Sequence, residues 1–311
     1  MAARDVPPPP PSSSNPEAAQ SSFAASSSAS SSVSHVSDTA RWVAMYRAME
    51  SERPDALFHD PWARKLAGPE GESILTSIPK ARQTAWPMIV RTQVMDELLL
   101  RTIRNDGIDT VLNLASGLDT RPYRLDLPSS LRWIEADFGD VLAYKEKILA
   151  GERARCAHEF APVDLTDDAA RSAFFTRVNA SAKQTFVVAE GLLAYLQSEQ
   201  VARLAKDLAA QPSFHWWLID LASPDLLKRL NKTWGKALAR SPLIFGPEEG
   251  TKFFEPYGWR EIEYRPMLEE SIRLKRTMPF ARVLRFMGKF YPKKMRERYA
   301  RFSGMVLFAK S

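Results

Sequence analysis

The sequence predicts an α/β fold with a mostly parallel sheet, and three observations lead to that prediction. Between residues 109 and 223, short apolar runs alternate with amphipathic stretches long enough to form helices. Such alternation is typical of right-handed βαβ units. The apolar runs lack a clean two-residue periodicity, which indicates strands covered on both faces. After residue 223 the alternation ends, and two late apolar runs there predict an antiparallel edge.

The chain before this alternation divides into two different segments. Residues 1–37 hold 13 serines and 6 prolines with almost nothing large and apolar. We therefore expect a disordered tail, because such a segment cannot offset the entropy of folding. Ser37 or Asp38 is placed to cap a first helix over TARWVAMYRAMESER. A second helix, PMIVRTQVMDELLLRTIRND, is expected to begin just after Trp86 and to end at Gly107.

Each element of the alternating region can be assigned in order. The expected strands are DTVLNLA, LRWIEADF, RCAHEFAPVDL, TFVVAE and FHWWLIDLAS, followed later by EIEYRPM and GMVLFAKS. The helices between them are VLAYKEKILAG, DDAARSAFFTRVN and SEQVARLAKDLAAQ, the last with Ser198 placed as its cap. One domain over 38–311 is expected, made of a helical cover (38–108), a cofactor-binding core (109–223), and a substrate cover with the late strands (224–311).

Composition excludes several classes of protein. The chain has 311 residues, 45% of them apolar, which is enough for a sizeable core. No apolar run reaches the roughly 18–20 residues of a membrane span. The single cysteine, Cys156, rules out an internal disulfide framework. The first residues also lack a secretory signal. We expect a cytoplasmic protein with no membrane contact.

The positive charge gathers near the C-terminus. The net charge is +6, and residues 260–311 carry 14 Lys and Arg against 5 Glu. Such a segment could bind nucleic acid or an anionic membrane. We favour the simpler interpretation, a solvated face, because LKRTMPFARVLRFMGKFYPKKMRERYARF shows no spacing of a nucleic-acid motif.

Small or acidic residues stand at the ends of four successive predicted strands. These residues are Ala115-Ser116-Gly117 with Asp119, then Glu135 with Asp137, then Asp164 with Leu165, and last Glu190. In an open α/β sheet, ligands bind beyond the carboxyl ends of the strands. One acid there could simply cap a helix, but four in a row predict a binding site.

The residue types narrow the ligand to a nucleoside. A turn of small residues lets the backbone approach it closely. An acid about 20 residues further on can accept hydrogen bonds from ribose hydroxyls. Both features fit NAD as well as S-adenosylmethionine. The dinucleotide fingerprint is missing, since ASGLDT has one glycine where three are needed. A cationic sulfonium also suits a pocket lined with carboxylates, so S-adenosylmethionine is favoured.

At these residues the sequence resembles the leucine carboxyl methyltransferase family, in particular its bacterial branch of S-adenosylmethionine-dependent methyltransferases. The resemblance runs from about Thr39 to the C-terminus. It is carried by TARWVAMYRAMESERPDALFHDPWARKLAG, MIVRTQVMD, VLNLASGLDTRPYRL, WIEADFGDVLAYKEKIL, PVDL and VVAEGLLAYL. It implies a class I methyltransferase fold, a doubly wound, mostly parallel seven-stranded sheet with an antiparallel late hairpin and N-terminal helices covering the pocket.

The resemblance also implies roles for individual residues. Arg91 would meet the cofactor's carboxylate, Gly117 would form the cofactor turn, Asp137 would bind the ribose, Asp164 and Leu165 would lie beside the adenine, and Glu190 would lie near the methionine end. The family usually has glycine where Ala115 stands and alanine where Ser116 stands. The methyl group of Ala115 therefore narrows the expected approach to the cofactor.

Simpler interpretations exist for most of these side chains. Arg91 could be an exposed helix charge, and Asp137 or Asp164 could cap the next helix. Asp119 and Arg121 could pair with each other, and we expect Arg124 to be structural. Tyr195, after the fourth strand, could contact the substrate or only pack its ring.

The expected reaction is in-line methyl transfer to an oxygen of a small molecule. The acceptor is a carboxylate or a hydroxyl, and a carboxylate or an acidic phenol is favoured because an ordinary hydroxyl needs a base and no convincing base is evident. The His and Cys residues show no metal-binding spacing, so no metal is expected. Two alternatives stay open: methylation of a protein's C-terminal leucine, and a non-catalytic cofactor- or nucleic-acid-binding protein using the basic segment. Nucleic acid is not the favoured partner, and the sequence does not define the oligomeric state.

Overall fold

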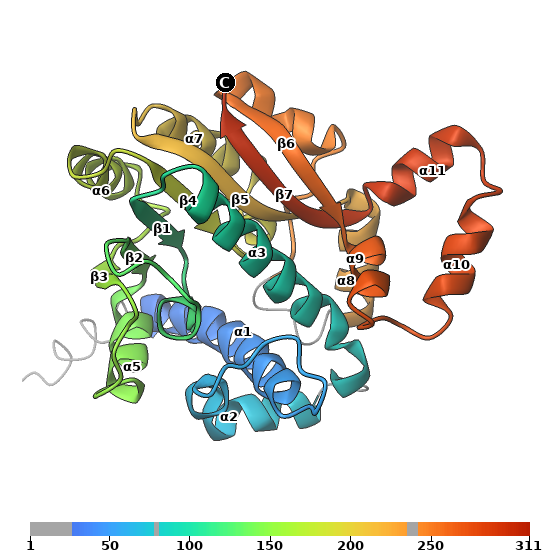
Figure 1. Cartoon of the computed structure of the whole chain (residues 1–311), viewed down its shortest axis with the longest axis horizontal. Coiled ribbons are helices and arrows are strands. Elements are labelled where there is room, and N and C mark those ends of the chain that lie inside the picture. Colours follow the sequence, from blue (N-terminus) through green and yellow to red (C-terminus); the bar gives the residue numbers. More distant parts are fainter. Residues whose placement is uncertain (1–26, 78–80, 235–241) are drawn as a thin grey trace, which may run out of the picture.

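The computed structural model describes residues 27–77, 81–234 and 242–311, which form a twisted sheet flanked by helices (Figure 1). The strands are β1 (Thr110–Leu114), β2 (Arg132–Asp137), β3 (Ala157–Pro162), β4 (Thr185–Ala189), β5 (Phe214–Ala222), β6 (Trp259–Pro266) and β7 (Ser303–Lys310). They lie in the order β3-β2-β1-β4-β5-β7-β6, and only the pairings of β7 with β5 and β6 are antiparallel. The predicted seven-stranded sheet with a late antiparallel hairpin is confirmed.

Helices connect and cover these strands. They are α1 (Ser27–Ser51), α2 (Ala63–Ser77), α3 (Trp86–Asn105), α4 (Arg121–Arg124), α5 (Gly139–Ile148), α6 (Asp168–Ala180), α7 (Ser198–Ala209), α8 (Pro224–Trp234), α9 (Met267–Arg273), α10 (Ala281–Gly288) and α11 (Lys293–Ala300), with 3-10 turns η1 (Ala81–Thr84), η2 (Leu193–Tyr195) and η3 (Gly250–Tyr257). No helix of the described ranges is long and apolar enough to cross a bilayer.

Both faces of the sheet are buried. On one face, Phe174 and Phe175 of α6 and the apolar side of α7 pack with Trp217 and Trp259. On the other face, the predicted apolar stripe of α3 packs against β1, β2 and β4. Burial on both faces explains why the strands read as continuous apolar runs.

The carboxyl ends of the strands are covered by the N-terminal helices. A third apolar cluster joins α1 and α2 to the start of α3 and to the loop after β1, with Tyr46 and Leu66 fully buried in it. In Figure 1 both helices lie below the sheet, across one end of it. Strand order reverses between β1 and β4, and ligands of open α/β sheets bind beside such a reversal.

Two predicted helix starts are wrong. Helix α1 begins at Ser27, inside the segment 1–37 expected to be a disordered tail, so Ser37 and Asp38 do not cap it. A helix anchored by its packed end extends at low cost, because each added residue gains a hydrogen bond. Residues 1–26 lie outside the described ranges. Helix α7 is capped by Gln197, not by Ser198, through reciprocal hydrogen bonds between Gln197 and Gln200.

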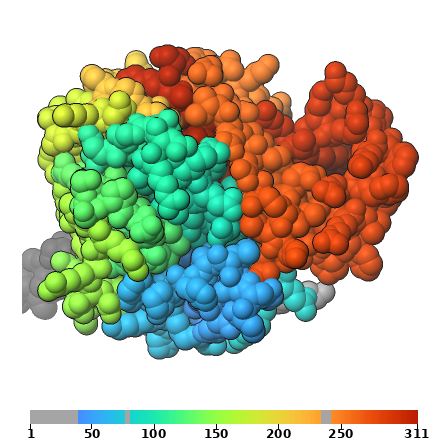
Figure 2. Space-filling view, viewed as in Figure 1, coloured from blue at the N-terminus to red at the C-terminus, as the bar shows by residue number. Residues whose placement is uncertain are grey.

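The basic C-terminal segment forms a projecting arm. We call residues 280–302, which contain α10 and α11, the arm. Figure 2 shows it standing out from the side of the molecule, and Figure 1 shows its two helices beyond the edge of the sheet. Nearly all of its side chains are exposed.

Candidate functional site

A large cavity of about 1500 Å³ opens at the carboxyl ends of the parallel strands. The eight residues expected from the sequence to contact the cofactor or the substrate all line it: Arg91, Ala115, Gly117, Asp137, Asp164, Leu165, Glu190 and Tyr195. These residues come from α3 and from the ends of four strands, so the fold gathers positions that are up to 104 residues apart in the sequence. The individual cofactor and substrate contacts expected for these residues stay predictions.

The turn after β1 closes onto the end of β2. Gly117 has a φ of 50°, and a Cβ built on it would lie 3.3 Å from Ala40 of α1. Its N–H donates to Asp137 Oδ2 at 2.6 Å, and the Phe138 N–H donates to Asp137 Oδ1 at 2.7 Å. Burial raises the pKa of Asp137, although the two backbone hydrogen bonds act in the opposite direction. The carboxylate thus fixes the turn while lining the cavity, and it does not cap α5, whose N-cap is Phe138.

Asp164 and Leu165 follow β3 at the neighbouring position of the sheet. Asp164 Oδ1 accepts hydrogen bonds from the N–H and the hydroxyl of Thr166, and its other oxygen has no partner among the described residues. The cap of α6 is Asp167, which accepts from the backbone N–H groups of its first turn. The helix-cap interpretation of Asp164 is therefore wrong, and one of its oxygens remains for a ligand.

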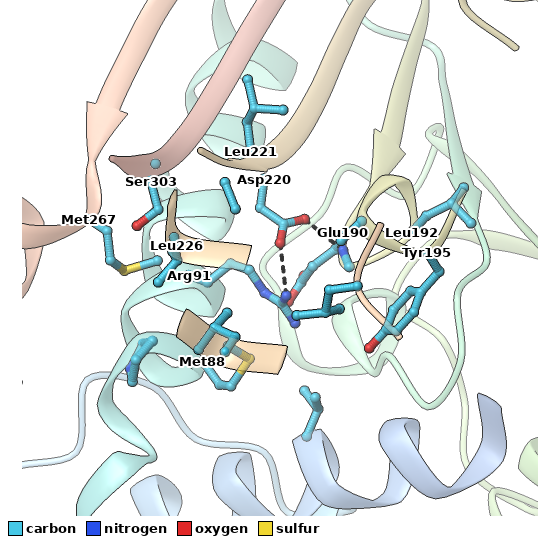
Figure 3. A pocket seen from close by; sticks show the side chains of 18 of the residues that line it. Met88, Arg91, Glu190, Leu192, Tyr195, Asp220, Leu221, Leu226, Met267 and Ser303 are labelled. Atoms are coloured by element: carbon cyan, nitrogen blue, oxygen red, sulfur yellow. Dashed lines mark hydrogen bonds and ion pairs between the residues drawn. The ribbon is translucent and has the colours of Figure 1, made fainter. Parts of the chain in front are cut away.

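Arg91 lies between two strand-end carboxylates (Figure 3). Its Nε donates to Glu190 Oε1 at 2.9 Å, and its Nη1 donates to Asp220 Oδ2 at 3.0 Å. Asp220 also accepts from the Gly191 N–H at 2.6 Å. Arg91 is buried, with only 7% of the residue exposed. The interpretation of Arg91 as an exposed helix charge is therefore wrong.

A second arginine connects this group to the loop after β1. Arg121 donates to Asp96, Asp119 and Glu190 at 2.6–2.8 Å, and Arg124 donates to both oxygens of Asp96. The alternative that Asp119 and Arg121 pair with each other is confirmed, as is the structural role of Arg124. Arg121 is only 2% exposed, so removing it would leave charges buried without a partner.

This connected group, which we call the ion-pair network, carries a net charge of −1. It contains the guanidiniums of Arg91, Arg121 and Arg124 and the carboxylates of Asp96, Asp119, Glu190 and Asp220. Burial alone would raise the pKa values of Asp119 and Glu190, but the neighbouring arginines outweigh burial and lower both. The carboxylates of Asp119 and Glu190 therefore stay ionised near neutral pH.

Tyr195 points toward the same cavity from η2 (Figure 3). Burial raises the pKa of its phenol, against the opposite effect of a hydrogen bond from Thr39. A phenol with a raised pKa stays protonated and is a poor general base. Among the described residues, no histidine lines the cavity and no cluster of His, Cys, Asp or Glu could hold a metal ion.

Two members of the ion-pair network were not predicted from the sequence. Asp220 stands at the carboxyl end of β5. The reasoning that acids at strand ends line a binding site would have identified it, because it ends the fifth predicted strand. Asp96 gives no such signal, because it lies within α3 and its partners are 25 and 28 residues away. In the other direction, Glu135 was counted among the strand-end acids but does not line the cavity. It forms a fully buried pair with Lys145 of α5.

The residues that line the cavity suit S-adenosylmethionine in size and charge. Small residues and positive φ angles at Ala115, Gly117 and Gly191 bring the backbone close to the ligand space. The buried Ser116 Oγ lines the cavity and has no hydrogen-bond partner among the described residues. S-adenosylmethionine carries one carboxylate, one ammonium and one sulfonium, hence a net charge of +1 that complements the ion-pair network.

Comparison with known proteins identifies the family. Residues 40–209 match the model of the family "Leucine carboxyl methyltransferase", and the chain belongs to that family. It is 36% identical to a protein of Frankia alni named "Putative S-adenosyl-L-methionine-dependent methyltransferase", over 57% of this chain and 65% of that protein. It is 32% identical to a protein of the same name from Rhodococcus jostii, over 79% and 90% of the two chains. The first two relatives are covered over 65% and 58% of their own lengths.

A solved structure agrees with the fold. A DUF574 family protein from Streptomyces avermitilis superposes with a TM-score of 0.54 at 11% identity, covering 88% of this chain and 97% of that one. This likeness shows the fold alone. Together, the family match and this likeness confirm the predicted family and the predicted fold class.

Proposed function

We propose that this protein is an O-methyltransferase that uses S-adenosylmethionine to methylate the carboxylate of an apolar small molecule. The observation that carries the proposal is the continuity of the cavity. It runs from the acidic strand ends to a wall of aliphatic side chains that belong to the last third of the chain. One end of the cavity thus suits the cofactor, and the other suits an apolar acceptor.

The strand ends supply the cofactor contacts. Asp137 accepts hydrogen bonds from the ribose hydroxyls, and Asp164 accepts one from the adenine amino group through its open oxygen. Glu190 and Asp220 attract the ammonium and the sulfonium. Arg91 uses only Nε and Nη1 on described protein groups, which leaves Nη2 to donate to the cofactor carboxylate.

The acceptor end combines apolar surface with positive charge. Its aliphatic lining includes Leu192, Leu221, Leu226, Leu230, Leu243, Ile244, Met267, Leu268 and Met278, and four cations stand along the same wall: Arg229, Arg285, Lys289 and Arg296. Such a lining favours a molecule with an apolar body and an anionic group.

The chemistry of the lining favours a carboxylate over a hydroxyl. The cofactor supplies a methyl group on a good leaving group, so the protein mainly positions the two reactants and excludes water. An alcohol would need a base, whereas the described lining of the cavity offers no histidine and a tyrosine whose pKa is raised. Of the carboxylates, Glu190 and Asp220 are already paired with Arg91, and Asp137 and Asp164 are assigned to the cofactor. A carboxylate is ionised at neutral pH and attacks directly.

Methyl-donor turnover tests the proposal. Labelled S-adenosylmethionine is supplied with medium- and long-chain carboxylic acids, acidic phenols, neutral alcohols and peptides ending in leucine. We expect turnover with one or more apolar acids and none with the alcohols. Turnover of phenols but not of acids would contradict the carboxylate assignment. An Asp137→Asn variant serves as the control for cofactor-dependent turnover.

The two alternatives give different results in the same assay. Preference for a peptide ending in leucine over small acids would support the protein methyltransferase. Absence of cofactor binding at millimolar S-adenosylmethionine by calorimetry would contradict every methyltransferase hypothesis and support a binding protein instead. Tight RNA binding that weakens steeply with salt would then point to the basic segment as the functional surface.

A further inference from the structure

Helix α10 of the arm has two different sides. Leu284, Gly288 and Tyr291, spaced as one side of a helix, line the cavity. Val283, Phe286, Met287 and Phe290, spaced as the other side, line no part of it. Their exposed fractions are 53%, 59%, 50% and 75%, and the rings of Phe286 and Phe290 contact each other. Phe280, just before the helix, is 78% exposed.

The arm stands out against the rest of the described surface. Of the eleven large apolar side chains that are exposed, nine belong to the arm, and the other two are Ile244 and Ile262. Five of the nine belong to the outer side of α10 or directly precede it: Phe280, Val283, Phe286, Met287 and Phe290. Isolated exposed apolar residues are normal, but a contiguous group on one helix side marks an interaction surface.

The arm is also strongly basic. It contains eight Lys and Arg and one acid, Glu297. Four of these cations form no ion pair with any described residue: Arg282, Lys289, Lys294 and Arg296. Arg282, Arg285 and Lys289 lie along one edge of the outer apolar side of α10, and none of them interrupts it. A short helix with an apolar side next to cations is typical of segments that lie in a membrane interface.

We propose that the arm docks the protein onto the surface of an anionic lipid bilayer. The outer side of α10 enters the boundary between headgroups and acyl chains, and the arm's cations attract the anionic headgroups. No segment crosses the bilayer, and the attachment is peripheral and reversible. This differs from the expectation of no membrane contact, which rested on the absence of a spanning segment.

Charge favours a bilayer over the other occupants of this surface. A second copy of the chain would bring two arms of the same sign together, which opposes pairing through the arms. The cations could bind the phosphates of a nucleic acid, but phosphate contacts do not explain why the outer side of α10 is apolar. An anionic bilayer offers both negatively charged headgroups for the cations and an apolar interior for the outer side of α10.

The docking has a consequence for the acceptor, and that consequence rests on the proposed function. The inner side of the arm forms part of the cavity wall. A docked arm therefore places the mouth of the cavity at the lipid interface. An amphiphilic carboxylate could enter from the bilayer without dissolving in water, so acceptors that partition into membranes are expected.

Vesicle co-sedimentation tests the docking without cofactor or acceptor. The full chain is spun with vesicles of phosphatidylcholine alone or mixed with phosphatidylglycerol, over a range of salt. We expect binding to the anionic vesicles to exceed that to neutral vesicles about tenfold or more and to weaken with salt. The double variant Phe286→Ser/Phe290→Ser should lose about tenfold in vesicle affinity. The double variant Arg282→Gln/Lys294→Gln should lose a similar amount.

Matched controls use exposed residues outside the arm. Ile262→Ser removes an exposed apolar side chain from β6, and Lys147→Gln/Lys183→Gln removes two exposed cations from the core domain. Neither control should change vesicle binding, and thermal unfolding verifies that all variants keep the fold. Charge variants that weaken binding while the phenylalanine variants do not would overturn insertion of the apolar side.

Other outcomes would identify a different occupant. A change in oligomeric state on Phe286→Ser/Phe290→Ser, without vesicle binding by the unaltered chain, would overturn the proposal in favour of a second copy. RNA binding that is lost in Arg282→Gln/Lys294→Gln, again without vesicle binding, would overturn it in favour of nucleic acid. Turnover of dissolved acids by a chain that binds no vesicles would overturn the docking and leave the proposed function standing.

Discussion

The two ends of the cavity are built in opposite ways. At the cofactor end, charged side chains are buried and matched, and Arg121 alone donates to three carboxylates with 2% of its surface exposed. At the arm, eight cations against one acid stand largely in solvent, and Phe290 is 75% exposed. The first region pairs most of its charges within the protein and leaves only a few polar atoms for a ligand, whereas the second leaves apolar surface and unpaired charge in solvent.

This difference shows how binding and stability are divided along the chain. The ion-pair network joins residues far apart in sequence, such as Arg91 with Asp220, and so it can form only when the core has folded. The arm's pairs, such as Arg285 with Glu269, are exposed and contribute little. Substitutions at the cofactor end should therefore affect stability and cofactor binding together, and substitutions in the arm should affect neither.

Removal of Arg121 should give the largest effect. Arg121→Met leaves Asp96, Asp119 and Glu190 with fewer partners in a buried setting, and breaking a buried pair in this way costs about 3–5 kcal/mol. Urea denaturation measures the free energy of unfolding. The matched substitution in the arm, Arg285→Met, should cost less than about 1 kcal/mol. Equal losses in the two variants would contradict the contrast between the regions.

Replacement of Asp137 should affect cofactor binding next most strongly. Asp137→Asn removes a charged acceptor for the ribose hydroxyls, and hydrogen bonds to charged groups contribute about 1.5–3 kcal/mol. Calorimetry should therefore show S-adenosylmethionine affinity reduced about ten- to hundredfold. Asp140→Asn, an exposed position in the first turn of α5, is the control and should bind normally. Unchanged affinity in Asp137→Asn would refute the ribose assignment.

Acid should destabilise the protein through the same network. The pKa values of Asp119 and Glu190 are lowered in the folded state, so their contribution is fully present above their unfolded values, about 3.9 and 4.3. That contribution is lost as the pH falls below those values toward the folded ones. Asp137 acts in the opposite sense, because its raised pKa makes the folded state bind a proton more readily than the unfolded state.

The network's share can be measured by comparing unfolding free energies at pH 7 and pH 3. Glu190→Gln removes one of the carboxyls with a lowered pKa, so this variant should lose less stability on acidification than the unaltered chain. Glu199→Gln, at an exposed position in the first turn of α7, is the matched control. An equal loss in Glu190→Gln and in the unaltered chain would show that Glu190 does not contribute.

The sequence was sufficient for those features that depend on local pattern. Alternation of strands and helices predicted the sheet, and acids at strand ends predicted the cavity edge, because both follow from the chain's own periodicity. The predicted helix starts were wrong where no single residue type determines the start of the helix. Gln197 caps α7 although Ser198 is the more usual cap residue, because Gln200 completes a reciprocal pair of hydrogen bonds.

The ion-pair network could not be predicted, because its pairs are set by the packing of distant elements. In the sequence, Asp96 is one of several polar positions on an amphipathic helix. Arg121 and Arg124 reach it only because the loop after β1 packs against α3. The two different sides of α10 could not be predicted from the sequence either. Periodicity shows an apolar stripe, but which stripe faces the cavity depends on how the arm leaves the sheet.

The smallest predicted effect concerns the departure from the family pattern at Ala115. Its φ of 49° lies in the left-handed region, which costs a residue with a Cβ about 1–2 kcal/mol and costs glycine nothing. Glycine also gives the unfolded chain more freedom, which offsets about 0.4–1 kcal/mol. Ala115→Gly should therefore stabilise the protein by about 0.5–1 kcal/mol, measured by urea denaturation. Ala143→Gly, on the exposed side of α5, should instead destabilise it by a similar amount. A loss of stability in both variants would show that the turn at the cofactor end is not strained, and that its alanine is tolerated there at no cost.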